Sequence, residues 1–218
     1  MIKYDRKPRF QRLYAGLLGK AFAAALAVAA LQLTVCAATV TLAPPSGTTT
    51  NVLALYTGET SVEIAGPGTV TLNPDNTYTG GTTLSGGTLA YYGTYHDGAS
   101  PLGSGALNIT SEDAAISGSG TIANDISAAV NMTFSPDEKI TLSGNNVFSA
   151  LTDVTRNTLE IAGGETCITG GLYLCLSSAG TAHFRQTDGS VQMVDSNVHL
   201  GNYKGATTSF TMTGGSFD

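Results

Sequence analysis

The side chains best suited to binding lie in one tyrosine-rich segment, Tyr91-Tyr-Gly-Thr-Tyr-His-Asp-Gly-Ala99, which holds three of the nine tyrosines of the chain. An exposed tyrosine offers an aromatic ring with a polar tip, and adhesive surfaces and glycan sites use such rings for contact. We therefore expect a binding loop formed by Tyr91, Tyr92, Tyr95 and His96. The alternative is that Tyr91 and Tyr92 end a strand and that the rest is a tolerated insertion.

The sequence contains no motif of a nucleophilic, metal-dependent or nucleotide-dependent active site. We expect no catalytic residue, no metal and no cofactor, and we expect His183 to be a solvent-facing strand residue. One enzymatic alternative stays open, because parallel β-helices include polysaccharide lyases and hydrolases whose acids converge on one face. Asp188 and Asp195 are seven residues apart, so in one continuous strand they would face opposite sides.

Cys167 and Cys175 flank Gly170 and Gly171. A hairpin with a two-residue loop would place the two cysteines on opposite faces, whereas a three-residue loop with a bulge would bring them opposite each other. A disulfide between them in an oxidising compartment therefore stays open.

The first twenty residues carry six of the ten basic residues and one acid, Asp5. An uncharged apolar run of fifteen residues follows at 21–35, with small residues at Ala37 and Ala38 behind it. A positive region, a short apolar run and small residues are typical of a secretory signal, and the run is short for a membrane span. We expect an N-terminal signal helix within residues 1–38, with cleavage near Ala37 to Thr39.

The rest of the chain is acidic. From Ala21 onward there are four basic and fifteen acidic residues, a balance of 4 − 15 = −11. Nucleic acid and anionic membrane surfaces are bound through Lys and Arg, so neither is an expected partner of this body. Membrane contact is expected only through the signal peptide or through a barrel outside this sequence.

Short runs with alternating apolar residues fill the chain after the signal. Such alternation places one apolar row on one face of a strand. Glycine, asparagine and aspartate separate the runs, so we expect almost only strands and turns. The clearest runs are Val62-x-Ile64, Val70-x-Leu72, Leu107-x-Ile109, Val130-x-Met132-x-Phe134, Ile140-x-Leu142, Leu159-x-Ile161, Leu172-x-Leu174-x-Leu176, Val191-x-Met193, Val198-x-Leu200 and Phe210-x-Met212.

Some of these strands repeat at a fixed offset. Residues 184–191 align with residues 210–217 at an offset of 26, and Leu159-Glu-Ile-Ala-Gly-Gly164 precedes them by 25. A period in this range indicates stacked repeats, since one apolar row cannot be buried by a single repeat. We expect about seven coils of about 25 residues, a rod roughly 35 Å long. An antiparallel sandwich is the alternative, although it gives no reason for a fixed offset.

The stretch Gly68-Thr-Val-Thr-Leu-Asn-Pro-Asp-Asn-Thr-Tyr-Thr-Gly-Gly-Thr-Thr-Leu-Ser-Gly-Gly-Thr-Leu89, followed by Ser100-Pro-Leu-Gly-Ser-Gly-Ala-Leu-Asn108, resembles the autotransporter-associated β-strand repeat. Pro74 and Asp75 before Asn76, and Pro101 in place of the usual Ala, depart from that pattern. The resemblance implies a right-handed parallel β-helix on the surface of a Gram-negative bacterium. It also implies export through the outer membrane by a C-terminal barrel.

Together these observations predict a signal peptide at 1–38, a linker or N-terminal cap at 39–51 and an all-β solenoid at 52–218. The sequence ends in mid-pattern, so we expect a passenger-like segment without its barrel. The predicted function is that of a structural or adhesive protein presenting loops to glycans or proteins of host or neighbouring cells. A carbohydrate-active β-helix enzyme and a fragment without a function of its own are the alternatives.

Overall fold

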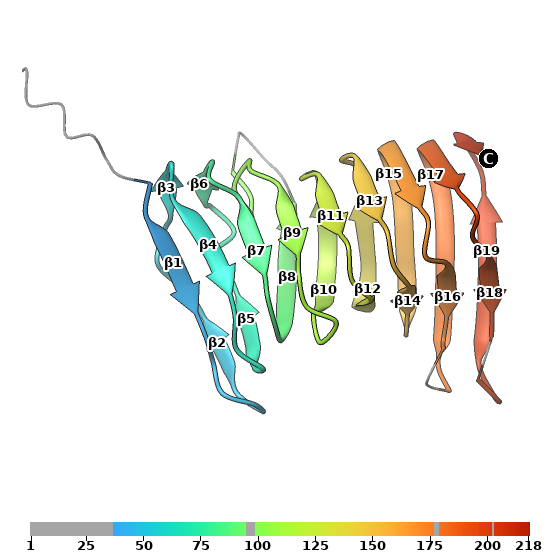
Figure 1. Cartoon of the computed structure of the whole chain (residues 1–218), viewed down its shortest axis with the longest axis horizontal. Coiled ribbons are helices and arrows are strands. Elements are labelled where there is room, and N and C mark those ends of the chain that lie inside the picture. Colours follow the sequence, from blue (N-terminus) through green and yellow to red (C-terminus); the bar gives the residue numbers. More distant parts are fainter. Residues whose placement is uncertain (1–36, 95–98, 177–178, 202) are drawn as a thin grey trace, which may run out of the picture. The chain divides into compact units, whose positions relative to one another are not determined.

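The computed structural model describes residues 37–94, 99–176, 179–201 and 203–218, and Ala37–Asp218 forms one compact unit (Figure 1). Within these ranges the strand pairings are parallel, for example between Val40 and Val62 and between Phe184 and Phe210. The all-β prediction is confirmed, and the parallel pairing rules out the antiparallel sandwich. The predicted signal helix lies outside the described residues. No helix in the described part of the chain has the length and apolar character of a transmembrane span.

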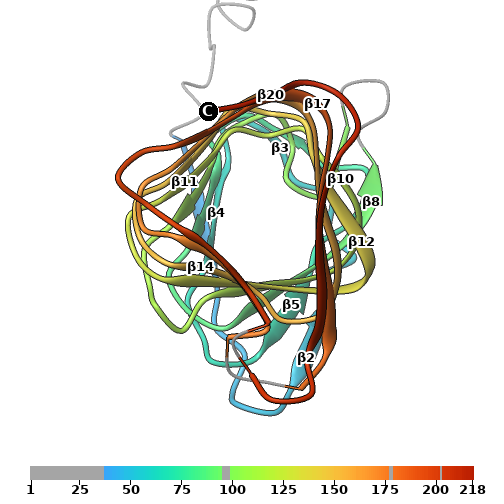
Figure 2. The same ribbon diagram turned by 90° about the vertical axis from the view of Figure 1, so that its right-hand side faces the viewer.

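The chain winds through three faces in each coil, and Figure 2 shows the coils superposed along the axis. Face 1 contains β1 (Thr39–Leu42), β4 (Ser61–Ile64), β7 (Thr82–Leu84), β9 (Leu107–Ile109), β11 (Ile126–Ala128), β13 (Asn146–Phe148) and β20 (Ser216–Phe217). Face 2 contains β2 (Thr49–Asn51), β5 (Thr69–Thr71), β14 (Thr152–Val154), β16 (Leu172–Leu174) and β18 (Val198–Leu200). Face 3 contains β3 (Thr57–Gly58), β6 (Thr77–Tyr78) and β19 (Thr207–Met212).

Five long strands bend from one face to the next. β8 (Thr88–Thr94), β10 (Ala115–Ile122) and β12 (Met132–Leu142) begin on face 2 and end on face 3. β15 (Asn157–Ile168) and β17 (Thr181–Met193) begin on face 3 and end on face 1. Each of these strands therefore joins two walls of the coil without an intervening loop.

Nine levels stack along face 1 within the described residues. The ladder of facing residues is Val40, Val62, Thr82, Leu107, Ile126, Asn146, Thr166, Val191 and Phe217. Eight strand spacings of about 4.8 Å make this body about 38 Å long.

The predicted coil length of about 25 residues is wrong for most of the solenoid. The step from Val62 to Thr82 is 82 − 62 = 20 residues, and the step from Asn146 to Thr166 is also 20. Only some coils are longer, such as the step of 25 from Thr166 to Val191. The predicted offset of 26 is confirmed where it was observed, because Phe184 faces Phe210 and Val191 faces Phe217.

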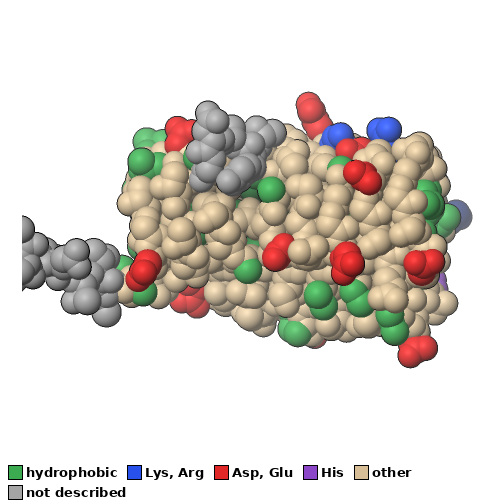
Figure 3. Space-filling view, turned by 90° about the horizontal axis from the view of Figure 1, so that it is seen from above, with side chains coloured by type: hydrophobic (Ala, Val, Ile, Leu, Met, Phe, Trp, Pro, Cys, Tyr) green, Lys and Arg blue, Asp and Glu red, His purple; other side chains and the backbone are tan. Residues whose placement is uncertain are grey.

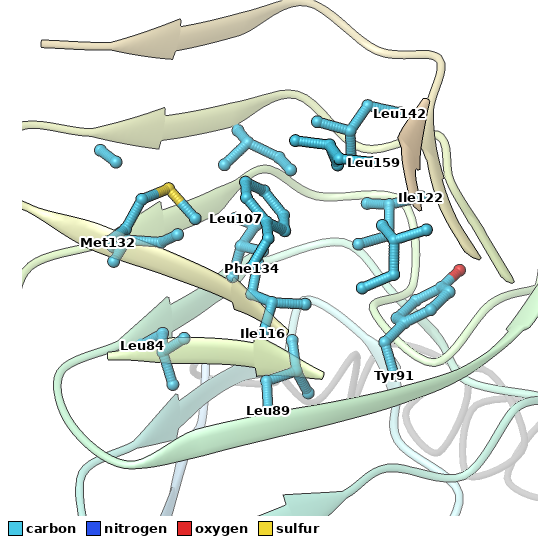
Figure 4. Close-up of a cluster of buried hydrophobic side chains, with 14 of the residues drawn as sticks. Leu84, Leu89, Tyr91, Leu107, Ile116, Ile122, Met132, Phe134, Leu142 and Leu159 are labelled. Atoms are coloured by element: carbon cyan, nitrogen blue, oxygen red, sulfur yellow. The ribbon is translucent and has the colours of Figure 1, made fainter. Parts of the chain in front are cut away.

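Inward side chains form one long apolar core. In Figure 4 Leu84, Leu107, Leu89, Ile116 and Phe134 converge between the walls of neighbouring coils. The same alternation turns every second residue outward, as with Asn108 between buried Leu107 and Ile109. Stacked rings extend the core at the C-terminal coils, where the centroids of Phe184 and Phe210 are 5.2 Å apart at an interplanar angle of 11°.

Buried amides hold the corners between faces. The Asn124 Nδ2 donates to the carbonyls of Gly103 and Gly105 at 3.1 and 2.7 Å. The Gln186 Nε2 donates to the carbonyl of Ser216 at 2.6 Å, one coil further on. Such bonds satisfy backbone groups that leave the strand ladder at a corner and would otherwise be buried without a partner.

The segment at 39–51 is part of the stack. β1 pairs with β4 over four residues and β2 pairs with β5 over three, so the segment forms the first coil of the described body.

Cys167 and Cys175 are free thiols. No hairpin joins them, because the turn after Ile168 leads from face 1 to β16 on face 2, and both strands pair in parallel. Cys167 points outward from β15, whereas Cys175 lies buried at a corner with a φ of 57°. Burial raises the pKa of the Cys175 thiol.

Candidate binding face

Tyr91 is a core residue and not part of a loop. It lies in β8, is fully buried, and points into the interior near Ile122 (Figure 4). Its hydroxyl donates to the carbonyl of Thr121 at 2.6 Å. The strand-end alternative is thus correct for this residue, and Tyr91 cannot touch a partner at the surface because the alternation of β8 turns it inward.

Tyr92, the next residue of β8, faces outward on face 3 with 47% of its surface exposed. Its hydroxyl donates to the carboxylate of Asp137, and this hydrogen bond raises the pKa of the Tyr92 phenol. Tyr95 and His96 lie outside the described residues. Of the four predicted binding residues, Tyr92 is therefore the one that the structure places at the surface.

A bulge in β12 lies next to Tyr92. Gly118 faces Pro136 and Gly120 faces Ile140, so β12 has two more residues than β10 between these pairs. The bulge carries Asp137, Glu138 and Lys139 outward. Bulges redirect side chains at sheet surfaces and are frequent near functional sites.

Residues of the following coil fix the bulge. The Asn157 Nδ2 donates to the carbonyls of Pro136 and Asp137 at 2.9 and 2.8 Å, and Asn157 has a φ of 52°. The Arg156 Nη2 donates to Asp137 Oδ1 at 2.6 Å. The polar groups of Tyr92, Asp137 and Arg156 thus form one network across three coils.

A second network continues along the same face. Thr141, Glu160 and Arg185 follow one another in register on β12, β15 and β17. Lys139 Nζ lies 3.0 Å from Glu160 Oε1, and Arg185 Nη1 lies 3.5 Å from Glu160 Oε2. The carboxylate is buried and Oε2 has no hydrogen bond, so its contact with Arg185 is an ion pair without hydrogen-bond geometry.

A groove of about 400 Å³ opens on face 3 between these networks and β8. Its lining residues are glycines, hydroxyl-bearing residues and two charged residues: Gly93, Ser119, Gly120, Thr121, Glu138, Lys139 and Thr141. Gly120 has a φ of 137°, and a Cβ there would collide with the carbonyl oxygen of Gly93. The glycines keep the floor low while the β12 bulge raises one wall.

The charges of the body are unevenly distributed. Acidic side chains are spread over the view of Figure 3, whereas basic side chains lie close together at its upper edge. Between residues 37 and 218 the basic residues are Lys139, Arg156, Arg185 and Lys204, and the first three belong to the two networks of face 3.

The other residues that sequence reasoning considered have structural positions. His183 faces outward, and its Nδ1 lies 2.7 Å from the hydroxyl of Ser209 in the next coil, as predicted from the alignment. Asp188 is an exposed turn residue whose Oδ1 accepts from the amide of Gly189, and Asp195 is exposed with a φ of 51°. Among the described residues no group of His, Cys, Asp and Glu is arranged to hold a metal ion.

The fold and this polar face define the class of protein: a parallel β-solenoid built from short coils. Residues 65–90 match the family model of the passenger-associated-transport-repeat. The match spans β5, β6, β7 and the start of β8, which is one full coil plus the first strand of the next, since Val70 faces Leu89. The chain therefore carries this repeat and is an autotransporter passenger-like repeat protein. Comparison with curated proteins and with solved structures gives no match.

Sequence reasoning missed Lys139, Glu160 and Arg185. A signal was present, because Glu160 and Arg185 are 25 residues apart, the same offset as Leu159 and Phe184. Lys139 was not accessible in this way, because the bulge in β12 shifts its register by two residues.

Proposed function

We propose that the protein is exported as an autotransporter passenger-like rod and acts at the surface of a Gram-negative cell as a structural or adhesive element. The observation that carries the proposal is the passenger repeat at 65–90, which forms one coil in the middle of a continuous stack. The repeat family is associated with secreted and outer-membrane proteins, and the right-handed form of the parallel β-helix is expected for it.

The shape and surface of the body support this role. A stack of nine levels presents a long repetitive surface, and solenoids of this kind use such surfaces for binding. On face 3, Tyr92 offers a half-exposed ring whose hydroxyl is held by Asp137. The segment with Tyr95 and His96 follows directly after Thr94, so in the proposal these two residues extend the same binding region. The repeat family also points to a structural passenger-like protein rather than an enzyme.

Surface display in a Gram-negative host tests the export step. We expect antibody against face 3 to label intact cells, and we expect mass spectrometry of the exported protein to find a start near Ala37 to Thr39. Retention in the cytoplasm with an intact Met1 would contradict the proposal.

Adhesion is tested separately on the exported protein. The Tyr92→Ser variant should reduce attachment to glycan-coated surfaces, with a loss of about 1 kcal/mol or more for a central contact. Tyr203→Ser is the matched control, because Tyr203 is exposed to a similar degree but lies away from this groove. Equal attachment of the two variants would remove Tyr92 from the binding site.

A further inference from the structure

The basic residues of face 3 stand out against an acidic body. Three of the four basic residues between 37 and 218 lie in the two networks beside the groove, and Asp137 and Glu160 are the carboxylates that hold them. Counting these five residues gives 3 − 2 = +1. The other ten acids outnumber basic residues everywhere else except Glu138 at the groove itself is included in them: 15 − 2 = 13 acids remain against Lys204. A small anion therefore finds its best electrostatic position here, whereas a long polyanion is repelled by the rest of the body.

Glu160 fixes Lys139 and Arg185 in place. The two cations come from β12 and β17, on either side of β15, and both reach the same carboxylate. The Glu160 side chain is 8% exposed, whereas the side chains of Lys139 and Arg185 are each 48% exposed. Each cation keeps N–H groups that its ion pair does not use, since an ammonium has three and a guanidinium five. Two positioned donors thus lie side by side at the surface.

The groove next to Lys139 suits a polyhydroxylated ligand. Its floor is formed at Gly93 and Gly120, and Ser119, Thr121 and Thr141 contribute hydroxyl groups. A hydroxyl is both a donor and an acceptor, which matches the hydroxyls of a sugar ring. An acidic peptide would instead need apolar pockets for its side chains, and the lining residues of this groove offer none. The half-exposed ring of Tyr92 adds an aromatic surface beside Gly93 and Ser119.

We propose that the groove on face 3 is a subsite for an acidic sugar, in which Lys139 and Arg185 bind the sugar carboxylate and the hydroxyl-lined floor accepts the ring. This proposal deepens the adhesive function proposed above, because it names the class of glycan that the face recognises. Charge-assisted hydrogen bonds to a carboxylate are stronger than neutral ones, so the carboxylate provides most of the selectivity.

Binding of glucuronate and of glucose to the purified full-length chain tests the proposal, since the two sugars differ only in the carboxylate. We expect glucuronate to bind about tenfold more tightly than glucose by calorimetry or ligand-observed NMR, and increasing salt to weaken it. Lys139→Gln and Arg185→Gln should each weaken glucuronate binding about tenfold. Lys204→Gln, a change of the basic residue outside the networks, should leave binding unchanged.

Each other outcome overturns the assignment. Equal binding of the two sugars would show that the carboxylate is not recognised, and tighter binding of the peptide Glu-Glu-Glu would show a peptide site. Absence of glucuronate binding to folded protein would remove the site. If a glutamine variant loses its β circular-dichroism signal, Lys139→Arg and Arg185→Lys replace it, and these should retain binding. Export and attachment to surfaces are measured independently, so they can succeed where this proposal fails.

Discussion

Single buried side chains of this solenoid have two different tasks, and neighbours in sequence can differ completely. Tyr91 fills the core and Tyr92 faces solvent, although they are adjacent in β8. The tyrosine-rich composition that suggested a loop therefore described the end of a strand in part. Composition alone could not separate the two residues, because the direction of a side chain depends on the register of the strand.

A pair of substitutions tests this difference. Tyr91→Ser should lower the free energy of unfolding by about 3–5 kcal/mol, since it leaves a large cavity and an unpaired carbonyl at Thr121. Tyr92→Ser should change it by less than about 1 kcal/mol, because the ring is half exposed. Urea unfolding of the two variants measures both values, and equal losses would place the two rings in similar environments.

Two buried phenols make the stability sensitive to high pH. Burial raises the pKa of Tyr78 and Tyr91 well above the ordinary value of about 10. The neutral phenols are favoured in the folded state, so their contribution is complete below pH 10 and is lost as the pH rises further. We expect the urea midpoint to fall above about pH 10. Tyr91→Phe should make that fall shallower, and an unchanged pH profile would contradict the burial of this phenol.

The corner amide of Asn124 gives a third test at this scale. Asn124→Ala should cost about 1–3 kcal/mol, because the carbonyls of Gly103 and Gly105 lose their donor in a buried corner. Asn108→Ala, a change on the exposed side of β9, is the control and should lie within about 0.5 kcal/mol of the parent chain. Chemical denaturation of the two variants compares them directly, and similar losses would mean that the amide is not a structural corner.

At the scale of elements, the corners limit how closely coils stack. Gly87 has a φ of 69°, and a Cβ there would lie inside contact distance of the carbonyl oxygen of Gly66 in the preceding coil. Gly47 has a φ of 74° but nothing within 4 Å of its Cβ position. Both residues need left-handed backbone angles, and only one of them also needs the space.

Alanine at the two glycines separates these needs. Gly47→Ala should cost about 1–2 kcal/mol for the backbone conformation alone. Gly87→Ala should cost clearly more, since the coil at 65–90 must also move away from its neighbour. Thermal unfolding of the two variants is the measurement, and equal shifts would contradict the close approach of Gly87 to Gly66.

The strands could be predicted from the sequence to a large extent, but the coil length could not. Alternation located strands such as Val62-x-Ile64 and Leu159-x-Ile161, which lie in β4 and β15. The step of 26 between Phe184 and Phe210 was visible because two long, similar coils follow each other. The 20-residue coils around Asn146 share only alternation and a polar corner, so no side chains mark their offset. The groove depends on the bulge of β12, which has no signature in the sequence.

At the scale of the whole molecule, the central claim is that 20-residue coils stack in parallel register. One outward column of face 1 tests it, because Ser127, Val147 and Cys167 lie on three successive levels and Cys167 is a native free thiol. Adjacent levels are about 4.8 Å apart, within the range of a disulfide, whereas two levels are about 10 Å apart and outside it.

Peptide mapping by mass spectrometry after mild oxidation provides the measurement. The account predicts that Val147→Cys forms a disulfide with Cys167 and that Ser127→Cys does not. A uniform period of 25 residues would instead place Leu142 opposite Cys167, since 167 − 25 = 142. Failure of Val147→Cys to cross-link to Cys167 in folded protein, or cross-linking of Ser127→Cys in its place, would contradict the stacking of these coils.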